Sequence, residues 1–188
     1  MHILVFLLDT VFFVFVCAAL LRAWLNGRRI GMYEQPGPFI MAVTNWLVMP
    51  LRRTLPVAWQ RSRWDVASVL AAVLLVLVHA GLLMAVWGQM GGHWGGHTAL
   101  GGAWFLPAWL GLAVQLLLRA AIQGLLLLVL LHAVLSWVQP HAPVQQWLGR
   151  LLAPLLRPIQ RVIPLVGGVD LSPLVLLLLL QVGLMLLG

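Results

Sequence analysis

Charged residues are scarce in this chain. They make up 8% of its 188 residues, whereas hydrophobic residues make up 63%, and the mean hydropathy is +1.04. In a soluble domain about a quarter of the residues are charged. The shortage therefore excludes an ordinary soluble domain, because many of the apolar side chains must have lipid as their solvent. The sequence predicts an all-α integral membrane protein.

Lysine is absent, cysteine occurs once, and carboxylates number four. The lone Cys17 excludes an intramolecular disulfide framework, and its place in an apolar run is typical of a small packing residue. Four carboxylates leave little for acid–base chemistry, and the sequence has no phosphate-binding loop, nucleophile elbow or paired carboxylate set. We therefore expect no enzyme, no catalytic residues and no cofactor.

Four apolar segments have the length of membrane spans. They cover about residues 3–25, 66–87, 112–137 and 170–188. A helix needs about twenty apolar residues to cross ~30 Å of hydrocarbon, at about 1.5 Å per residue. The last segment, counted from Asp170, has nineteen residues. We expect it to cross only with local thinning of the bilayer or with flanking anchors.

The connections between these segments differ in composition. Residues 26–64 and 139–169 are rich in proline, tryptophan and arginine. This mixture favours interfacial amphipathic segments that lie on the membrane, and their prolines are expected to break them into short pieces. Residues 89–103 instead form a Gly- and His-rich connection with no residue that is ionised at neutral pH.

The two halves of the chain share a motif. Residues 50–56 and 158–164 both read proline, apolar, any residue, arginine, any residue, apolar, proline, at an offset of 108 residues. An aspartate, Asp65 or Asp170, and then an apolar span follow each copy. The sequence thus predicts two parallel repeats, residues 1–88 and 104–188, each made of a span, an interfacial amphipathic segment and a span.

The placement of arginine predicts the orientation. The connection after the first span carries six arginines, the connection after the third carries three, and the connection between them carries none. By the positive-inside rule, the basic segments are cytoplasmic and both termini lie outside. Because the arginines flank spans instead of forming one basic patch, we expect no nucleic-acid partner.

Several short motifs stand out along the chain. LRAWL occupies residues 21–25, and GGVDLSP occupies residues 167–173 and is the most specific stretch. With the repeated proline motif, the marked positions are Pro50, Pro56, Pro158, Pro164, Gly167, Gly168, Asp170, Ser172 and Pro173. Together they resemble the YggT/YlmG (YGGT) family of membrane proteins over nearly the whole chain, outside the Gly- and His-rich connection.

The resemblance implies a multi-pass protein of the bacterial inner membrane, with relatives in plastids. Members of the family are linked to osmotic or ion stress tolerance, to cell division and envelope shape, and in plastids to cytochrome assembly and nucleoid distribution. The chain departs from the family pattern at residues 31–36, where an Asn-Pro turn is usual, and at Trp46, where proline is common.

Four arginines in the repeated segments are candidate binding residues: Arg52, Arg53, Arg157 and Arg161. Guanidinium groups pair well with phosphate, so we expect contacts with anionic lipid headgroups or an anionic partner. The alternative is that these arginines only fix the topology and anchor the interfacial segments. The two interpretations are compatible.

Asp9 and Arg119 are the ionisable residues deepest in the predicted spans. Such residues usually face the interior of a helix bundle or a polar cavity. Both lie six to seven residues from the outer start of their span, so an intramembrane ion pair is predicted as one possibility. The alternative is that each side chain snorkels to the outer interface.

The histidines suggest cofactors only weakly. His79 and His132 are predicted at different depths, roughly 20 Å and 8 Å above the inner interface, which disfavours a bis-histidine haem. His93 and His97 have the spacing of metal ligands on a helix, but glycines surround them and no carboxylate is near. We expect no metal site.

The sequence thus predicts a non-enzymatic membrane protein that acts as an accessory factor in envelope or osmotic homeostasis, cell division or the assembly of a membrane complex. Its expected partners are anionic membrane lipids and other membrane proteins, with a homo-oligomer as a further possibility. The alternative is an oligomeric conduit for ions or small solutes. Besides Asp9 and Arg119, only Gln115, Gln123 and Gln181 could line it.

Overall fold

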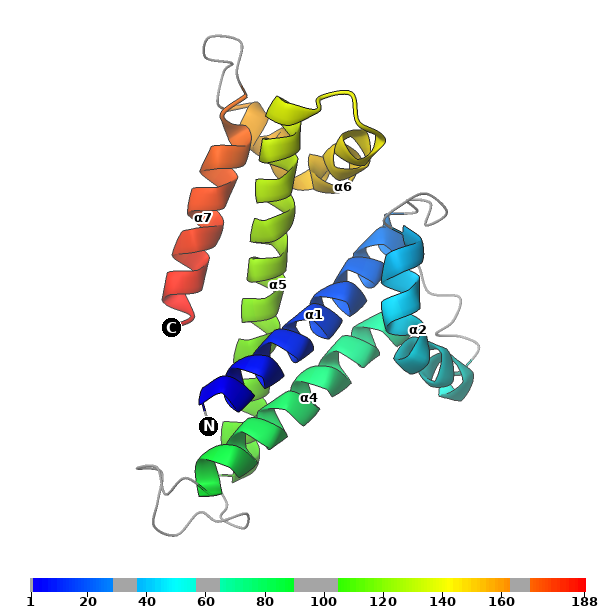
Figure 1. The fold of residues 1–188 in the computed structure, drawn as a ribbon, viewed down its shortest axis with the longest axis vertical. Coiled ribbons are helices and arrows are strands. Elements are labelled where there is room, and N and C mark those ends of the chain that lie inside the picture. Colours follow the sequence, from blue (N-terminus) through cyan, green and yellow to red (C-terminus); the bar gives the residue numbers. More distant parts are fainter. Residues whose placement is uncertain (1, 29–36, 57–64, 90–104, 163–169) are drawn as a thin grey trace.

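The computed structural model describes residues 2–28, 37–56, 65–89, 105–162 and 170–188, and these residues form helices and short connections without strands (Figure 1). The helices are α1 (His2–Gly27), α2 (Gly37–Thr54), α4 (Val66–Gln89), α5 (Phe105–Val138), α6 (Pro143–Gln160) and α7 (Ser172–Leu186). The predicted all-α class is confirmed.

Three helices are long and apolar enough to cross a membrane. Their apolar stretches are Ile3–Gly27, Val66–Val86 and Phe105–Val138. They contain the first three predicted spans, apart from one residue at the end of the second. The fourth, α7, is apolar but has only 15 residues. At about 1.5 Å per residue it is roughly 22 Å long, which is shorter than the hydrocarbon core of ~30 Å.

Helix α5 begins earlier than predicted. It starts at Phe105 and runs for 34 residues, whereas the sequence predicted a span from about residue 112. Pro107 does not interrupt it, because a proline in the first turn of a helix lacks only an N–H that has no intrahelical partner there.

The prediction that prolines break the interfacial segments holds only in part. Helix α2 begins directly after Pro36 and ends two residues before Pro56, but the prolines inside the helices do not interrupt them. Helix α2 continues through Pro50, and α6 continues through Pro154 and Pro158. Each proline removes one helical hydrogen bond. In α6 this loss is offset by a buried apolar face, formed by Trp147, Leu148, Leu151, Leu152 and Leu156. Arg150 and Arg157 lie on its exposed side.

The helices form two groups that meet along α5. Helix α1 packs against α4, α7 packs against α5, and α4 joins the groups by packing against α5. Helices α2 and α6 both lie by the C-terminal end of α1, with α6 near the top of the view and α2 at mid-height on the right (Figure 1). At this end Leu25 of α1 shares a buried cluster with Ile40 of α2 and with Leu148 of α6.

Alanines form the contact between α1 and α4. Ala19 of α1 is buried in one cluster with Ala67, Ala71 and Ala72 of α4. Small residues let two helices approach closely, which favours association where lipid removes the hydrophobic driving force. This close contact holds the C-terminal half of α1 beside the start of α4.

The order of a long apolar helix, an 18-residue amphipathic helix and another apolar helix occurs twice. If α2 is moved by the 108-residue offset of the sequence motif, it covers 145–162, two residues from the observed α6. The amphipathic helices therefore occupy corresponding places in the two halves.

Candidate functional site

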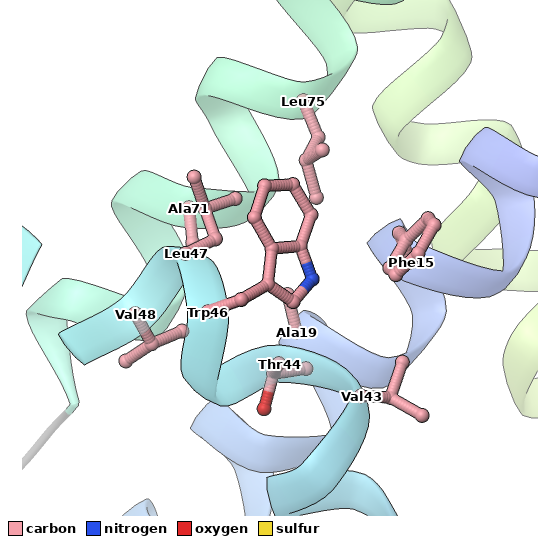
Figure 2. Close-up of a pocket in the computed structure, with 9 residues that line it drawn as sticks. All are labelled: Phe15, Ala19, Val43, Thr44, Trp46, Leu47, Val48, Ala71 and Leu75. Atoms are coloured by element: carbon pink, nitrogen blue, oxygen red, sulfur yellow. The ribbon is translucent and has the colours of Figure 1, made fainter. Parts of the chain in front are cut away.

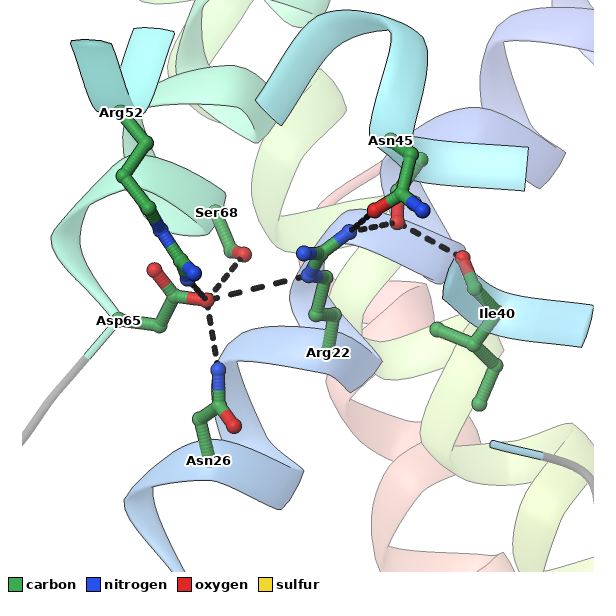
Figure 3. Close-up of polar contacts among 8 residues, drawn as sticks. Arg22, Asn26, Ile40, Asn45, Arg52, Asp65 and Ser68 are labelled. Carbon is green, nitrogen blue, oxygen red and sulfur yellow. Dashed lines mark hydrogen bonds and ion pairs between the residues drawn. The ribbon is translucent and has the colours of Figure 1, made fainter. Parts of the chain in front are cut away.

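A buried aspartate joins α1, α2 and α4 near the C-terminal end of α1 (Figure 3). Asp65 immediately precedes α4, and its side chain is 6% exposed. Its Oδ2 accepts hydrogen bonds from Asn26 Nδ2 of α1 at 2.6 Å, from Ser68 Oγ at 2.8 Å and from Arg52 Nη2 of α2 at 3.0 Å. The carboxylate thereby links the end of α1, the end of α2 and the start of α4.

Arg22 of α1 lies beside this carboxylate with its side chain 7% exposed. Its Nη1 donates to Thr44 Oγ1 at 2.7 Å and to Asn45 Oδ1 at 2.8 Å, both on α2. Its Nε is 3.9 Å from Asp65 Oδ2, and this buried nitrogen has no hydrogen-bond partner among the described residues. The guanidinium is thus fixed by hydrogen bonds on the Nη1 side, and on the Nε side it has only the longer ion pair with Asp65.

The electrostatics of the cluster favour the ionised aspartate. Burial alone raises the pKa of Asp65, but the hydrogen bond from Ser68, the positive charge and hydrogen bond of Arg52 and the hydrogen bond from Asn26 outweigh it. They hold the pKa of Asp65 below its ordinary value. One negative charge therefore faces two arginines, and the cluster keeps a positive excess.

A pocket of about 280 Å³ opens beside the cluster and is lined by Arg22, Val48, Met49, Arg52 and Arg53. Three of its five lining residues are arginines. The Arg52 side chain is 48% exposed, and Arg53 is exposed as well. The pocket has the charge and the donors to hold an anionic group.

An apolar crevice adjoins this pocket. Figure 2 shows it between α1, α2 and α4, with the Trp46 ring close to Phe15 and Leu75. The rings of Trp46 and Phe15 meet edge to face at 5.6 Å. Buried Val48 lines both the crevice and the arginine pocket. The arginine pocket and the apolar crevice therefore share a wall on α2.

The structure brings two of the predicted binding residues, Arg52 and Arg53, into one pocket. Sequence reasoning missed Arg22, Asn26 and Ser68. A signal for them was present: an arginine inside an apolar span needs a partner, and Arg22 and Asn26 are four residues apart, hence on one helix face. Locating the partner required knowing how α1 packs on α4.

The second half builds a different arrangement. Arg157 and Arg161 are exposed, and neither pairs with Asp170 in the part of the chain that the structure describes. Asp170 accepts hydrogen bonds from Gln160 Nε2 at 2.8 Å and from the Ser172 N–H at 2.9 Å. Burial raises the pKa of Asp170, but the Ser172 and Gln160 hydrogen bonds and the nearby His132 lower it more.

The remaining motif residues have mixed positions. Pro50 and Pro158 lie inside helices, and exposed Pro56 follows α2. Ser172 and Pro173 are buried at the start of α7. Pro164, Gly167 and Gly168 fall outside the described residues.

Asp9 and Arg119 do not form the ion pair that was predicted as one possibility. Each contacts another residue. Asp9 Oδ1 is 2.9 Å from His79 Nε2 of α4, and His79 stacks on Phe12 with ring centroids 4.7 Å apart. Arg119 Nη1 donates to the Gly188 oxygen at 3.2 Å. The reason is packing: α1 lies against α4, which brings His79 to Asp9, whereas Arg119 faces the end of α7.

The histidines do not assemble a metal centre among the described residues. No group of three His, Cys, Asp or Glu side chains could hold a metal ion there. His79 contacts Asp9 and Phe12, while His132 lies near Gly149 of α6. His93 and His97 fall outside the described residues.

Comparison with known proteins gives a family. A family model described as CCB3/YggT matches residues 1–86 and 111–188. The chain is 36% identical to "Uncharacterized protein YggT" of Escherichia coli K12 over 184 residues, which is 97% of this chain and 87% of that protein. It is 32% identical to "Uncharacterized protein in proC 3'region" of Vibrio alginolyticus over 189 residues, covering 100% of this chain and 95% of the relative. No solved structure matches the chain.

Proposed function

This chain belongs to the CCB3/YggT family, and on that premise we propose that it is a non-enzymatic accessory protein of the bacterial inner membrane. It would contact anionic lipid headgroups and other membrane proteins through the basic helices by the C-terminal end of α1. Its role would lie in envelope or osmotic homeostasis, in cell division or in assembly of a membrane complex.

The observation that carries the proposal is the shared position of α2 and α6. Both amphipathic helices lie by the C-terminal end of α1 (Figure 1). Exposed arginines lie at the end of each helix or directly after it, namely Arg52, Arg53, Arg157 and Arg161. Basic amphipathic helices bind anionic membrane surfaces through buried apolar area and electrostatic attraction. With the positive-inside rule, the C-terminal end of α1 is cytoplasmic and both termini are outside.

The lipid part is tested on protein that is extracted with its native lipids. Lipids that co-purify with the wild type should be enriched in anionic species relative to the membrane, as mass spectrometry measures. Arg157→Gln/Arg161→Gln should reduce this enrichment, because it removes two exposed charges from α6. A bound lipid mixture identical to that of the membrane would contradict the proposal.

The protein part is tested by crosslinking in intact membranes followed by purification. An accessory role predicts one or more membrane proteins that co-purify reproducibly and are lost when α2 or α6 arginines are replaced. Recovery of the chain alone under these conditions would contradict this part of the proposal.

The conduit receives less support from the contacts. Gln115 Nε2 donates to the Leu187 carbonyl at 2.7 Å, and Arg119 binds Gly188. These two polar side chains therefore hold the end of α7 instead of lining a path. Ion flux through proteoliposomes that contain only the purified protein would reverse this preference.

A further inference from the structure

We propose that the pocket of Arg22, Arg52 and Arg53 is a saturable site for the phosphate group of one anionic phospholipid, with a single such site per chain. The inference rests on the proposed function, because it assigns to one pocket the lipid contact that the proposal gives to the basic helices. It adds that the ligand group is a phosphate and that one lipid binds per chain. It also assigns a role to the buried Arg22, whereas general attraction of lipid to the exposed arginines would involve no buried residue.

The charge balance leaves the pocket positive. Arg22, Arg52 and Arg53 line it, and Asp65 is the carboxylate that faces two of them, at 3.9 Å from Arg22 Nε and 3.0 Å from Arg52 Nη2. Asp65 Oδ2 already accepts three hydrogen bonds. Among the described residues no carboxylate is paired with the third guanidinium, that of the exposed Arg53. Its charge is therefore available to an anion that enters the pocket.

Arg22 is held in place before any ligand arrives. Two hydrogen bonds from its Nη1 to Thr44 and Asn45 fix the guanidinium plane. Its buried Nε lacks a hydrogen-bond partner among the described residues. Unpaired buried donors are rare in folded proteins. On that side the guanidinium has only the ion pair with Asp65 Oδ2 at 3.9 Å. It is therefore held in a fixed orientation beside the pocket, and guanidinium groups bind phosphate well.

The surroundings favour a lipid over a soluble phosphate. Val48 and Met49 complete the pocket wall beside the arginines, and Met49 is 54% exposed. Val48 also lines the apolar crevice under Trp46 (Figure 2). The crevice itself, at about 10 Å³, is too small for an acyl chain. The exposed Met49 beside the arginines is the apolar surface that the start of an acyl chain could contact and that a free phosphate would leave unused.

The second half does not reproduce the site. The position 108 residues after Arg22 is Leu130, an apolar side chain that is 45% exposed. Asp170 is exposed and binds Gln160 and Ser172. Within the described ranges it has no arginine within 4 Å. Although the sequence motif occurs twice, the buried arginine occurs once, so one site per chain is expected.

The experiment counts lipids on the intact protein. Purified full-length chain in neutral detergent is titrated with phosphatidylglycerol, and bound lipids are resolved by native mass spectrometry. The wild type should bind a first phosphatidylglycerol at much lower concentration than any further one. Phosphatidylcholine should show a much weaker first step, because the choline cation in its headgroup offsets the charge of the phosphate.

Two charge-matched variants separate the pocket from general attraction. Arg52→Gln/Arg53→Gln should weaken the first binding step by about tenfold. Arg28→Gln/Arg150→Gln removes two exposed arginines outside the pocket and should leave that step within about twofold. Because Arg52 also contacts Asp65, the single variant Arg53→Gln serves as a second test. It should lower the affinity without lowering the thermal stability.

The outcomes distinguish the two proposals. If both double variants weaken binding equally, or if millimolar inorganic phosphate displaces the first lipid, the pocket proposal is wrong while a general lipid preference stands. If neither the wild type nor any variant prefers phosphatidylglycerol over phosphatidylcholine, the proposed lipid function fails as well.

Discussion

At the scale of single residues, Asp65 is the side chain that connects the ends of α1 and α2 with the start of α4. It links Asn26, Arg52 and Ser68 and is the nearest counter-charge to the buried Arg22. Removing one partner of a buried ion pair lowers the stability by more than the pair contributes to it, because the other charge stays buried without a counter-charge. The exposed Asp170 is not paired with a buried arginine in the described part of the chain.

We therefore predict that Asp65→Asn lowers the free energy of unfolding by about 2–4 kcal/mol. The matched variant Asp170→Asn should cost less than about 1 kcal/mol, since it removes an exposed carboxylate that accepts neutral hydrogen bonds. Thermal unfolding of the two variants in the same detergent measures the difference. Equal losses would show that burial of the Arg22–Asp65 cluster adds nothing.

The lowered pKa of Asp65 predicts a pH dependence of stability. Because this pKa is lower in the folded protein than in the unfolded chain, folding favours the ionised form. The stabilisation is fully present above the unfolded value near 4 and is lost as the pH falls through the lower folded value. Unfolding curves recorded from about pH 6 down to about pH 2 should show a loss in the wild type that is smaller in Asp65→Asn. Parallel pH profiles would contradict the assignment.

At the scale of elements, the sequence predicted the three long spans well because length and hydropathy determine them directly. It placed Arg52 and Arg53 correctly in a basic segment but could not find their contact with Asp65, which depends on the packing of α1, α2 and α4. It also overstated the effect of Pro50, Pro154 and Pro158. A proline pattern shows which hydrogen bonds are lost, but not the tertiary burial that offsets them.

The contact between α1 and α5 predicts how a glycine substitution behaves. A Cβ added at Gly124 would lie 3.0 Å from Cys17 Sγ, whereas nothing lies within 4 Å of one added at Gly111. Cys17 Sγ also contacts the Ala120 carbonyl at 3.4 Å. Both glycines lie inside α5, where alanine is favoured over glycine by up to about 1 kcal/mol. Gly111→Ala should therefore stabilise the protein, whereas Gly124→Ala should be less favourable than Gly111→Ala by roughly 1–2 kcal/mol because of overpacking.

A double variant identifies the cause of that effect. Cys17→Ala removes the sulfur that the new methyl group would meet, so Gly124→Ala should cost less in the Cys17→Ala background than in the wild type. Melting temperatures of the four proteins in this cycle measure the coupling. Additive effects would mean that α1 and α5 do not contact each other through this pair.

At the scale of the whole molecule, two similar halves are joined into an asymmetric protein. Both have an amphipathic helix by the C-terminal end of α1 (Figure 1), yet the first half buries an arginine–aspartate cluster and the second buries the leucine face of α6. Helix α7 is the shorter partner of α5, and its end is bound by Gln115 and Arg119, ten and fourteen residues into α5. The last helix, α7, therefore ends beside the middle of α5.

This arrangement makes the orientation testable with single cysteines. Cys17 is the only cysteine of the chain, so a Cys17→Ala background can carry one new cysteine at Thr54, beside Arg53, or at Gly188. With the basic helices cytoplasmic, a membrane-impermeant maleimide added to intact spheroplasts should modify the cysteine at position 188 and spare the one at position 54 until the membrane is opened. Since α7 is roughly 22 Å long, labelling at 188 also requires the membrane to thin there. Labelling of position 54 from outside would place the arginine pocket in the wrong leaflet, whereas protection of both sites would show that α7 stops within the bilayer.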